Sequence, residues 1–329
     1  MTDTVALLMR TTDTLSSADR WEHIQARLGI NRMLHRVKPG LYTLGEPDPD
    51  SPVFVTSNYK LSFDALRSSL KGMSAWILVL DTHGINVWCA AGKGTFGTNE
   101  LVKRIALTNL RQVVRTRVLI LPQLGATGVA AHEVKKQTGF KVEYGPVRAS
   151  DLPEYMKTRK ATAEMRRVRF TLLDRMTLVP VEMLGYALPT LIAGAVLYFL
   201  GGWFSALALV AAVLAGAVLH PILLPWIPVK DFSVRGFILG LLVMIPFLVA
   251  SLTGSQGALW LRLLKLVPIV LGYPTVTAFI ALNFTGSSTF TSVLGVKKEI
   301  YRYIPLMAWF LGISVVLTIG FAVAKALGG

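Results

Sequence analysis

The single cysteine of the chain lies in a short segment that could support chemistry at a bulky ligand. Cys89 is the only cysteine among 329 residues. A thiolate is a nucleophile and a soft metal ligand, whereas a thiol is often a buried core filler. The neighbours of Cys89 are aromatic, small and cationic, which favours a segment that packs against a flat ligand. A cysteine that only fills the core remains the alternative. The segment comprises Asn86, Val87, Trp88, Cys89, Ala90, Ala91, Gly92 and Lys93.

Other routes to catalysis at this cysteine have weaker support in the sequence. A nucleophilic cysteine needs a neighbouring base, for which His83 and His132 are the candidates. No hydrolase-like context surrounds either histidine, so we expect His83 in a loop and His132 on a helix surface. A closed zinc site normally needs four ligands, and a chain with a single cysteine is a poor candidate for such a site.

A glycine-rich turn offers a second candidate binding element. Gly125, Thr127 and Gly128 follow an apolar run and precede a helical pattern. Glycines at such a turn let backbone amides approach a phosphate at a helix start. The full dinucleotide fingerprint needs a third glycine and a later acidic residue, and both are missing. The sequence of this turn therefore argues against NAD binding. A ligand with a phosphodiester or amide tail remains compatible with it.

The elements that would position these residues alternate between strand and helix. Residues 1–40 read as a helical lead-in that ends at a Lys-Pro-Gly sequence. The pattern then predicts strands at 53–56, 75–80, 117–121 and 141–143, with helices at 62–70, 86–93, 99–110, 129–137 and from 151. Such alternation is typical of a doubly wound α/β fold with a parallel sheet, and apolar strands indicate cover on both faces. Ligands of these folds bind at the carboxyl ends of the strands.

The second half of the chain has the composition of a membrane domain. The chain is 53% hydrophobic with a mean hydropathy of +0.53. A helix needs about 20 apolar residues to cross a bilayer. Long uncharged runs predict five transmembrane helices near 179–200, 203–225, 235–253, 263–282 and 304–325. The expected domains are residues 1–155, a basic linker at 156–177, and an all-α membrane domain at 178–329.

The distribution of basic residues predicts the orientation of the chain. The formal net charge is +15, and lysines and arginines collect in the linker, the second-to-third loop and the fourth-to-fifth loop. By the positive-inside rule the N-terminal domain is cytoplasmic and the C-terminus outside. The N-terminus has no signal-peptide pattern. We expect a multi-pass protein of the inner membrane whose charge faces membrane lipid. We expect no nucleic-acid partner, because no aromatic stacking pattern accompanies the charge.

Three segments together carry a resemblance to known corrinoid proteins. Residues 57–67, 86–93 and 121–140 look like the corrinoid-binding domain of the corrinoid iron–sulfur protein large subunit. The cysteine within residues 86–93, together with five apolar spans, resembles one branch of that group: the corrinoid protein of the mercury-methylation pair. The resemblance covers about residues 40–160 by motif and 178–329 by architecture.

The resemblance implies a Rossmann-like domain that holds a base-off, cobalamin-type corrinoid. Cys89 would then be the lower cobalt ligand on a helix, residues 86–93, that caps the ring. Ser57 and Asn58, with Gly125, Thr127 and Gly128, would contact the ring or its tail. The implied activity is that of a corrinoid-dependent methyltransferase that gives mercury(II) a methyl group, forming methylmercury.

Partners follow from the same resemblance. An iron–sulfur cluster normally takes four thiolates, so a chain with one cysteine has no cluster of its own. A ferredoxin-like iron–sulfur protein would supply electrons, and a methyl-tetrahydrofolate-dependent protein would supply methyl groups. Two other functions stay open. One is a corrinoid carrier of the acetyl-CoA-pathway type that passes methyl to another acceptor; the other is a membrane transporter or sensor with a cytoplasmic α/β domain.

Overall fold

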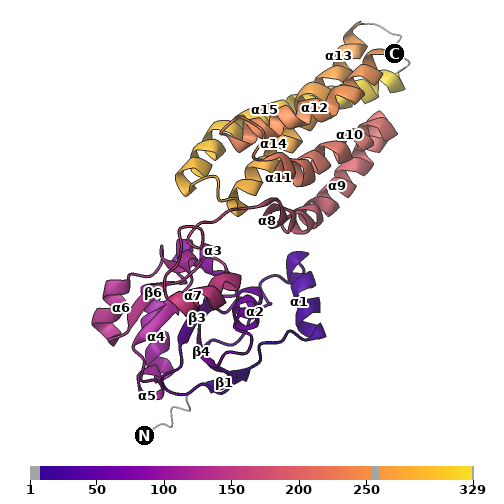
Figure 1. The fold of residues 1–329 in the computed structure, drawn as a ribbon. Coiled ribbons are helices and arrows are strands. Elements are labelled where there is room, and N and C mark those ends of the chain that lie inside the picture. The colour runs from indigo at the N-terminus through magenta and orange to yellow at the C-terminus, as the bar shows by residue number, and fades with distance from the viewer. Residues whose placement is uncertain (1–7, 254–258, 328–329) are drawn as a thin grey trace. The chain divides into compact units, whose positions relative to one another are not determined.

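The computed structural model describes residues 8–253 and 259–327, and it divides the chain into two compact units (Figure 1). The first unit is Met1–Val168 and the second is Arg169–Gly329. The first contains a mixed α/β sheet, and the second is helical. Each unit is described by itself below.

The first unit is built on one six-stranded sheet in the order β1-β2-β4-β3-β5-β6. The strands are β1 (Leu8–Thr11), β2 (Gly40–Leu44), β3 (Val53–Ser57), β4 (Ala75–Leu80), β5 (Val118–Leu121) and β6 (Lys141–Tyr144). Strands β4, β3, β5 and β6 are parallel to one another, whereas β2 runs antiparallel to β4 and pairs in parallel with β1. The helices are α1 (Ser17–Arg27), α2 (Lys60–Ser69), α3 (Val87–Lys93), α4 (Thr98–Leu107), α5 (Leu110–Val113), α6 (Ala131–Thr138) and α7 (Leu152–Thr158).

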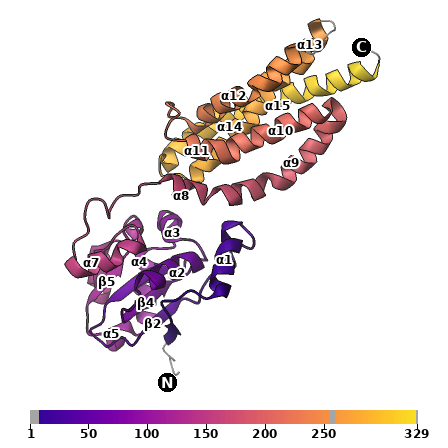
Figure 2. The same cartoon turned by 45° about the vertical axis from the view of Figure 1, so that its right-hand side comes forward.

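Helices cover both faces of this sheet, as the apolar strands indicate (Figure 2). Side chains alternate along a strand. Val53 and Val55 therefore pack in one layer with α3, α4 and α6, and Phe54 packs in the other with α2 and α7. Strand β4 divides in the same way, and its whole length is buried. The central strands are thus fixed by apolar layers on both sides.

The start of the chain differs from the sequence-based expectation. Strand β1 and helix α1 both lie within residues 1–40, where a wholly helical lead-in is predicted, and β2 begins where that segment ends, at Gly40. Strand β2 pairs with β4, for example Leu41 with Leu78, and β1 then pairs with β2. The sheet is therefore mixed and not wholly parallel. Pairing with β4, distant in sequence, overrides the local pattern.

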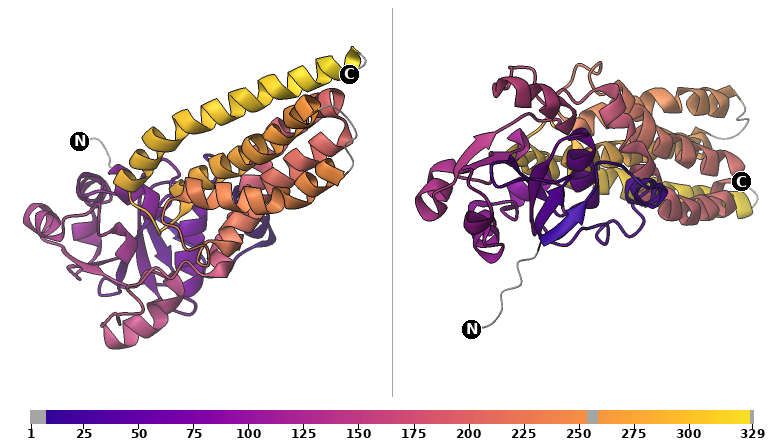
Figure 3. Two further views of the ribbon diagram at one scale, coloured as in Figure 1. Left: turned by 90° about the horizontal axis from the view of Figure 1, so that it is seen from above. Right: turned by 60° about the horizontal axis from the view of Figure 1, so that its bottom comes forward.

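The second unit contains five helices long and apolar enough to cross a membrane, counted within the described ranges. Its helices are α8 (Leu172–Met176), α9 (Val179–Gly201), α10 (Trp203–Leu214), α11 (His220–Leu223), α12 (Phe232–Thr253), α13 (Leu259–Val267), α14 (Tyr273–Phe284) and α15 (Val293–Ala326). The π-helical turns Ala215–Leu219 and Pro268–Gly272 join α10 to α11 and α13 to α14. The five predicted apolar helices are thus confirmed as candidate spans, and Figure 3 shows α15 running alongside the other apolar helices.

Close helix packing in the second unit depends on small residues. Gly236 and Gly240 of α12 face α14, where an added Cβ would lie 2.5 Å from Ala281 Cβ and 2.6 Å from Pro274 Cα, respectively. Small residues at such crossings let helix backbones approach closely in apolar surroundings. The contact between α12 and α14 is therefore fixed by the absence of side chains at these two positions.

Candidate functional site at helix α3

The order in which strands are added to the sheet reverses at β3, which has β4 on one side and β5 on the other. The chain leaves β3 through α2 to reach β4, and later returns through α3, α4 and α5 to β5 on the opposite side. In open α/β sheets, ligands bind outside the carboxyl ends of the strands where the strand order reverses. The carboxyl ends of β3 and β5 are therefore the first place to look for a site.

A cavity of about 320 Å³ lies at this position. Its walls are mostly apolar and come from β3, β5, α2, α3 and the segment before α7. They are formed by Phe54, Val55, Thr56, Ser62, Ala65, Leu66, Asn86, Val87, Trp88, Ile120, Leu121, Pro122, Leu124, Pro146, Val147, Ala149 and Leu152. The predicted residues Asn86, Val87 and Trp88 thus meet at one cavity with residues that the sequence did not single out. The residues that the sequence did not name individually come from β3, β5 and α2 and from the segments after β5 and β6. Those of α2 and of the segment after β5 lie within residues 57–67 and 121–140, which carry the resemblance.

Helix α3 has seven residues and is capped at both ends. At its start, Asn86 Oδ1 accepts a hydrogen bond from the Cys89 N–H at 2.9 Å. At its end, Gly94 adopts the left-handed conformation (φ 82°), which glycine takes without steric cost. Val87, Ala90 and Ala91 form the buried face.

Cys89 lies between the buried and exposed faces of α3. Its side chain is half-buried and forms no disulfide, and Trp88 beside it is 38% exposed. The cavity wall includes Asn86, Val87 and Trp88 but not Cys89. Gly92 and Lys93 are exposed at the end of the same helix. A half-buried thiol next to an exposed indole ring is accessible to a ligand that lies against the helix.

Asn58 and Ser57 at the end of β3 have different surroundings. Asn58 Oδ1 accepts hydrogen bonds from Thr82 N–H (3.0 Å), Thr82 Oγ1 (2.9 Å) and Gly84 N–H (3.0 Å). Asn58 Nδ2 donates to Asp81 Oδ1 at 3.2 Å. Asn58 therefore holds the loop that leads into α3. Ser57 is fully buried, and its Oγ has no hydrogen-bond partner within the described structure.

Residues 125–128 form a tightly packed turn away from the cavity wall. A Cβ on Gly125 would lie 2.5 Å from Phe96 Cε1, and one on Gly128 would lie 2.2 Å from the Phe96 carbonyl oxygen. Thr127 is exposed, and Pro122 and Leu124 of the same loop line the cavity instead. Close packing against Phe96 accounts for both glycines, and a role for Gly125, Thr127 or Gly128 in ligand contact stays a prediction.

The two histidines near this region are surface residues. The His83 side chain is 69% exposed and that of His132 is 82% exposed. His83 has a positive φ of 58° in the loop that Asn58 holds. Both positions agree with the expected loop and helix-surface roles.

Comparison with known proteins adds a family similarity to this site. A family model described as CO dehydrogenase/acetyl-CoA synthase delta subunit matches residues 8–156. The acetyl-CoA decarbonylase/synthase complex subunit gamma of Methanopyrus kandleri is 37% identical over 124 residues, which are 37% of this chain and 26% of that protein. The subunit gamma of Archaeoglobus fulgidus is 35% identical over 114 residues, which are 34% of this chain and 24% of that protein.

A third relative carries the name of its cofactor. The corrinoid/iron-sulfur protein large subunit of Moorella thermoacetica is 26% identical over 153 residues, covering 44% of this chain and 34% of that protein. The matched parts thus span about a quarter to a third of these relatives. The family match ends at residue 156, before the first apolar helix. The family similarity therefore lies in the α/β unit that contains α3 and the cavity.

Proposed function

We propose that the first unit is a Rossmann-like domain that binds a base-off corrinoid at the carboxyl ends of β3 and β5, and that Cys89 is the lower ligand of its cobalt. The observation that carries the proposal is the position of Cys89. It lies half-buried on a capped helix whose neighbouring residues, Asn86 to Trp88, line the cavity at the strand reversal. The similarity to the corrinoid/iron-sulfur protein large subunit of Moorella thermoacetica supports the choice of cofactor.

The residues present suit such a cofactor. The walls of the cavity are largely apolar, which suits the flat face of a corrin ring. Ser57 Oγ, a buried hydroxyl without a partner within the described structure, lies on β3 but outside that wall. Cys89 offers one soft donor, which suits a transition metal. The cavity of about 320 Å³ is at the small end of ligand sites. The fit therefore depends on the chemistry of the wall and the thiol rather than on volume.

A bound corrinoid would supply a cobalt centre that can accept a methyl group and pass it on. The residues of the chain have separate tasks around it. Cys89 would hold the metal through its sulfur as a thiolate. Asn86 caps the helix that carries Cys89, and Trp88 forms part of the cavity wall. Asn58 positions the loop before α3 and acts through it.

For the methyl acceptor, we propose mercury(II), with methylmercury as the product. Mercury(II) is an electrophile, so it needs a methyl group that arrives with electron density, as a carbanion-like or a radical-like group. An anionic sulfur ligand raises electron density at the metal it binds, as thiolates do in haem proteins. Cys89 is the specific feature that favours this acceptor. The activity would be that of a corrinoid-dependent methyltransferase.

A methyl carrier of the acetyl-CoA-pathway type is the second candidate function. It is favoured by the family match and by the names of the gamma-subunit relatives. Such a carrier passes methyl to a nucleophilic acceptor in another protein and does not need an anionic sulfur ligand. The two functions therefore differ in what Cys89 contributes.

The proposed partners follow from the cofactor. One cysteine cannot bind an iron–sulfur cluster, so electrons to restore the cofactor would come from a ferredoxin-like iron–sulfur protein. A methyl-tetrahydrofolate-dependent protein would supply methyl groups. We place the first unit in the cytoplasm and the C-terminus outside, with the apolar helices in the inner membrane, because of the loop charges.

One reconstitution tests both parts of the proposal. The full chain, purified in detergent, is loaded with a methylated corrinoid reagent and mixed with a mercury(II)–thiol complex. The native chain and a His132→Ala control should give methylmercury, whereas Cys89→Ala should bind corrinoid with a changed cobalt spectrum and give none. Binding without product from any form favours the carrier. A chain that retains no corrinoid refutes the cofactor assignment.

A further inference from the structure

The second unit contains a polar cavity of about 580 Å³ between the starts of α12 and α15. Its wall comes from the loop before α12, the first turns of both helices and the hydroxyl-rich segment before α15. The charged residues in this wall are Lys230, Asp231, Arg235, Lys298, Glu299 and Arg302. All of them belong to Arg169–Gly329, so this cavity is separate from the one beside α3.

Both carboxylates of this cavity are already engaged by uncharged donors. Glu299 is buried, and its Oε2 accepts hydrogen bonds from the Ser233 N–H at 3.0 Å and the Ser233 hydroxyl at 3.1 Å. The Tyr303 hydroxyl donates to Asp231 Oδ2 at 2.6 Å. Arg235 donates to the carbonyl oxygens of Val229 and, at 3.1 Å, of Leu224. The acidic groups therefore serve the packing of the helix starts.

Three cations of the cavity have no acidic partner. Lys230, Lys298 and Arg302 are exposed and form no salt bridge within residues 8–253 and 259–327. The hydroxyls of Thr289 and Thr291 lie in the same wall. The Arg302 guanidinium also lies over the Tyr303 ring, 5.3 Å from its centroid. Exposed ammonium and guanidinium groups next to hydroxyls are donors that suit a phosphate group.

Apolar surface adjoins the mouth of this cavity. Leu294 is 78% exposed and Tyr301 is 81% exposed on the first turns of α15, and Phe290 in the cavity wall is 53% exposed. The candidate spans Phe232–Thr253 and Leu294–Ala326 begin here. A ligand with both a phosphate and long apolar chains would contact the cations of the cavity and the apolar surface beside it. A soluble phosphate would contact only the cations.

We propose that this cavity binds the phosphate of an anionic phospholipid, with Lys230, Lys298 and Arg302 as its counter-charges. Basic pockets between membrane helices are sites for anionic headgroups. The acyl chains lie along the exposed apolar face of α15. This assignment does not depend on the proposed corrinoid chemistry of the first unit.

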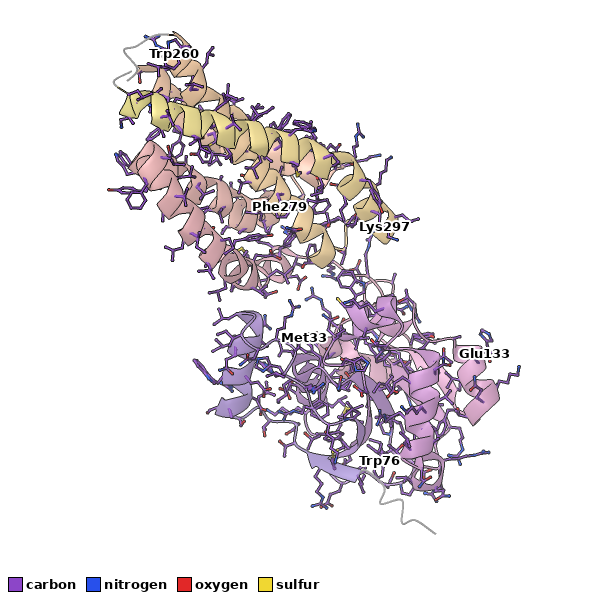
Figure 4. All side chains as sticks on the ribbon, turned by 180° about the vertical axis from the view of Figure 1, so that it is seen from behind. Met33, Trp76, Glu133, Trp260, Phe279 and Lys297 are labelled. Atoms are coloured by element: carbon purple, nitrogen blue, oxygen red, sulfur yellow. The ribbon has the colours of Figure 1, made fainter. Side chains whose placement is uncertain are left out.

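Lipid retention by the full chain in detergent tests the assignment. Native mass spectrometry compares phosphatidylglycerol, phosphatidylcholine with the same acyl chains, and inorganic phosphate. The test variant is Lys298→Gln with Arg302→Gln, and both side chains are exposed. The control, Arg262→Gln with Lys325→Gln, removes the same charge elsewhere. Figure 4 shows Trp260, two residues from Arg262, at the end of the helical unit opposite Lys297.

We expect the native chain and the control to retain phosphatidylglycerol but not phosphatidylcholine. The test variant should bind it about tenfold or more weakly, because each juxtamembrane cation contributes about 1 kcal/mol. Equal loss in test and control variants, or undiminished retention in the test variant, would overturn the site. Competition by inorganic phosphate as effective as that by phosphatidylglycerol would overturn the lipid assignment and leave a soluble anion.

Discussion

Asn86 and Cys89 are joined by a hydrogen bond in which the side-chain oxygen of Asn86 accepts the backbone N–H of Cys89 at 2.9 Å. The bond caps the helix that presents the thiol. Asn86→Ala should cost about 1 kcal/mol of helix stability, felt mainly in α3 because the helix has only seven residues. We expect faster loss of bound corrinoid with little change in thermal unfolding. Asn86→Ser, which restores a cap, should recover retention; equal loss in both variants would contradict a capping role.

Ser57 and Asn58 are adjacent buried residues that should respond oppositely to truncation. Asn58→Ala leaves the donors of Thr82 and Gly84 without their acceptor, at about 1–3 kcal/mol for such a buried group. Ser57→Ala removes a hydroxyl that has no partner within the described structure and should leave stability unchanged or slightly higher.

Thermal unfolding of both variants, followed by circular dichroism in the same detergent, measures this contrast. A loss of stability in Ser57→Ala as large as that in Asn58→Ala would be inconsistent with it. Corrinoid retention gives a second readout, since weaker retention by a fully stable Ser57→Ala would support a cofactor contact for its hydroxyl.

Glycines in the first unit divide into crowded and open positions. Gly128→Ala would force a Cβ to within 2.2 Å of the Phe96 carbonyl oxygen, whereas a Cβ at Gly92 meets nothing within 4 Å. Gly128→Ala should therefore lower the unfolding temperature. Gly92→Ala in α3 should raise helix stability by up to about 1 kcal/mol. If Gly92→Ala also weakens corrinoid retention, the ring lies against this face of α3; unchanged retention would place the ring elsewhere.

The surroundings of Asp19 should make the stability of the first unit sensitive to acid. Its carboxylate accepts hydrogen bonds from Lys60 Nζ (2.5 Å) and Arg67 Nη2 (2.9 Å), and from the Ser16 N–H. Burial by itself would raise the pKa of Asp19, but the hydrogen bonds from Lys60, Ser16 and Arg67 outweigh burial and hold that pKa well below its ordinary value.

The sign of the effect follows from this lowered pKa. An unfolded aspartate titrates near pH 3.9, so the stabilisation is complete above about pH 4 and is lost as pH falls toward the folded pKa. Asp19→Asn should be less stable at pH 7 by about 2 kcal/mol and should lose less further stability between about pH 4 and 2. Urea unfolding at each pH checks this, with exposed Glu46→Gln as the control; parallel pH profiles for native chain and Asp19→Asn would contradict it.

The helical unit should be sensitive to side-chain size at one face of α12. Gly236→Leu places a side chain where a Cβ alone would lie 2.5 Å from Ala281 Cβ, whereas Gly185 in α9 has nothing within 4 Å. We expect Gly236→Leu to lower the thermal stability of the full chain in detergent and Gly185→Leu to leave it nearly unchanged. Similar melting curves for the two variants would show that the contact between α12 and α14 is not required.

The central strands and the membrane helices could be predicted because their signals are local. Residues 75–80 form a wholly apolar run, and β4 occupies Ala75–Leu80. The helix predicted at residues 86–93 is observed at Val87–Lys93, with Asn86 as its cap. The five apolar helices could be predicted from the length of the uncharged runs alone.

The parts that sequence reasoning missed depend on contacts between distant residues. Strand β2 follows a Lys-Pro-Gly break and owes its conformation to pairing of residues such as Leu41 with Leu78. The cavity wall includes Ser62 and Leu152, which meet only once α2 and α7 pack on the same face of the sheet. The glycines at 125 and 128 have the composition of a phosphate loop, yet their surroundings are set by Phe96, which no local pattern indicates.

Both free edges of the sheet are short and carry charge. Strands β1 (Leu8–Thr11) and β6 (Lys141–Tyr144) have four residues each, and they include Arg10, Lys141 and Glu143. Long, flat, apolar edges recruit strands from other molecules, whereas short charged ones discourage it. In the proposed membrane location, copies of the chain would share one plane and meet more often than copies in free solution. Short, charged edges would then limit sheet-to-sheet aggregation between neighbouring α/β units.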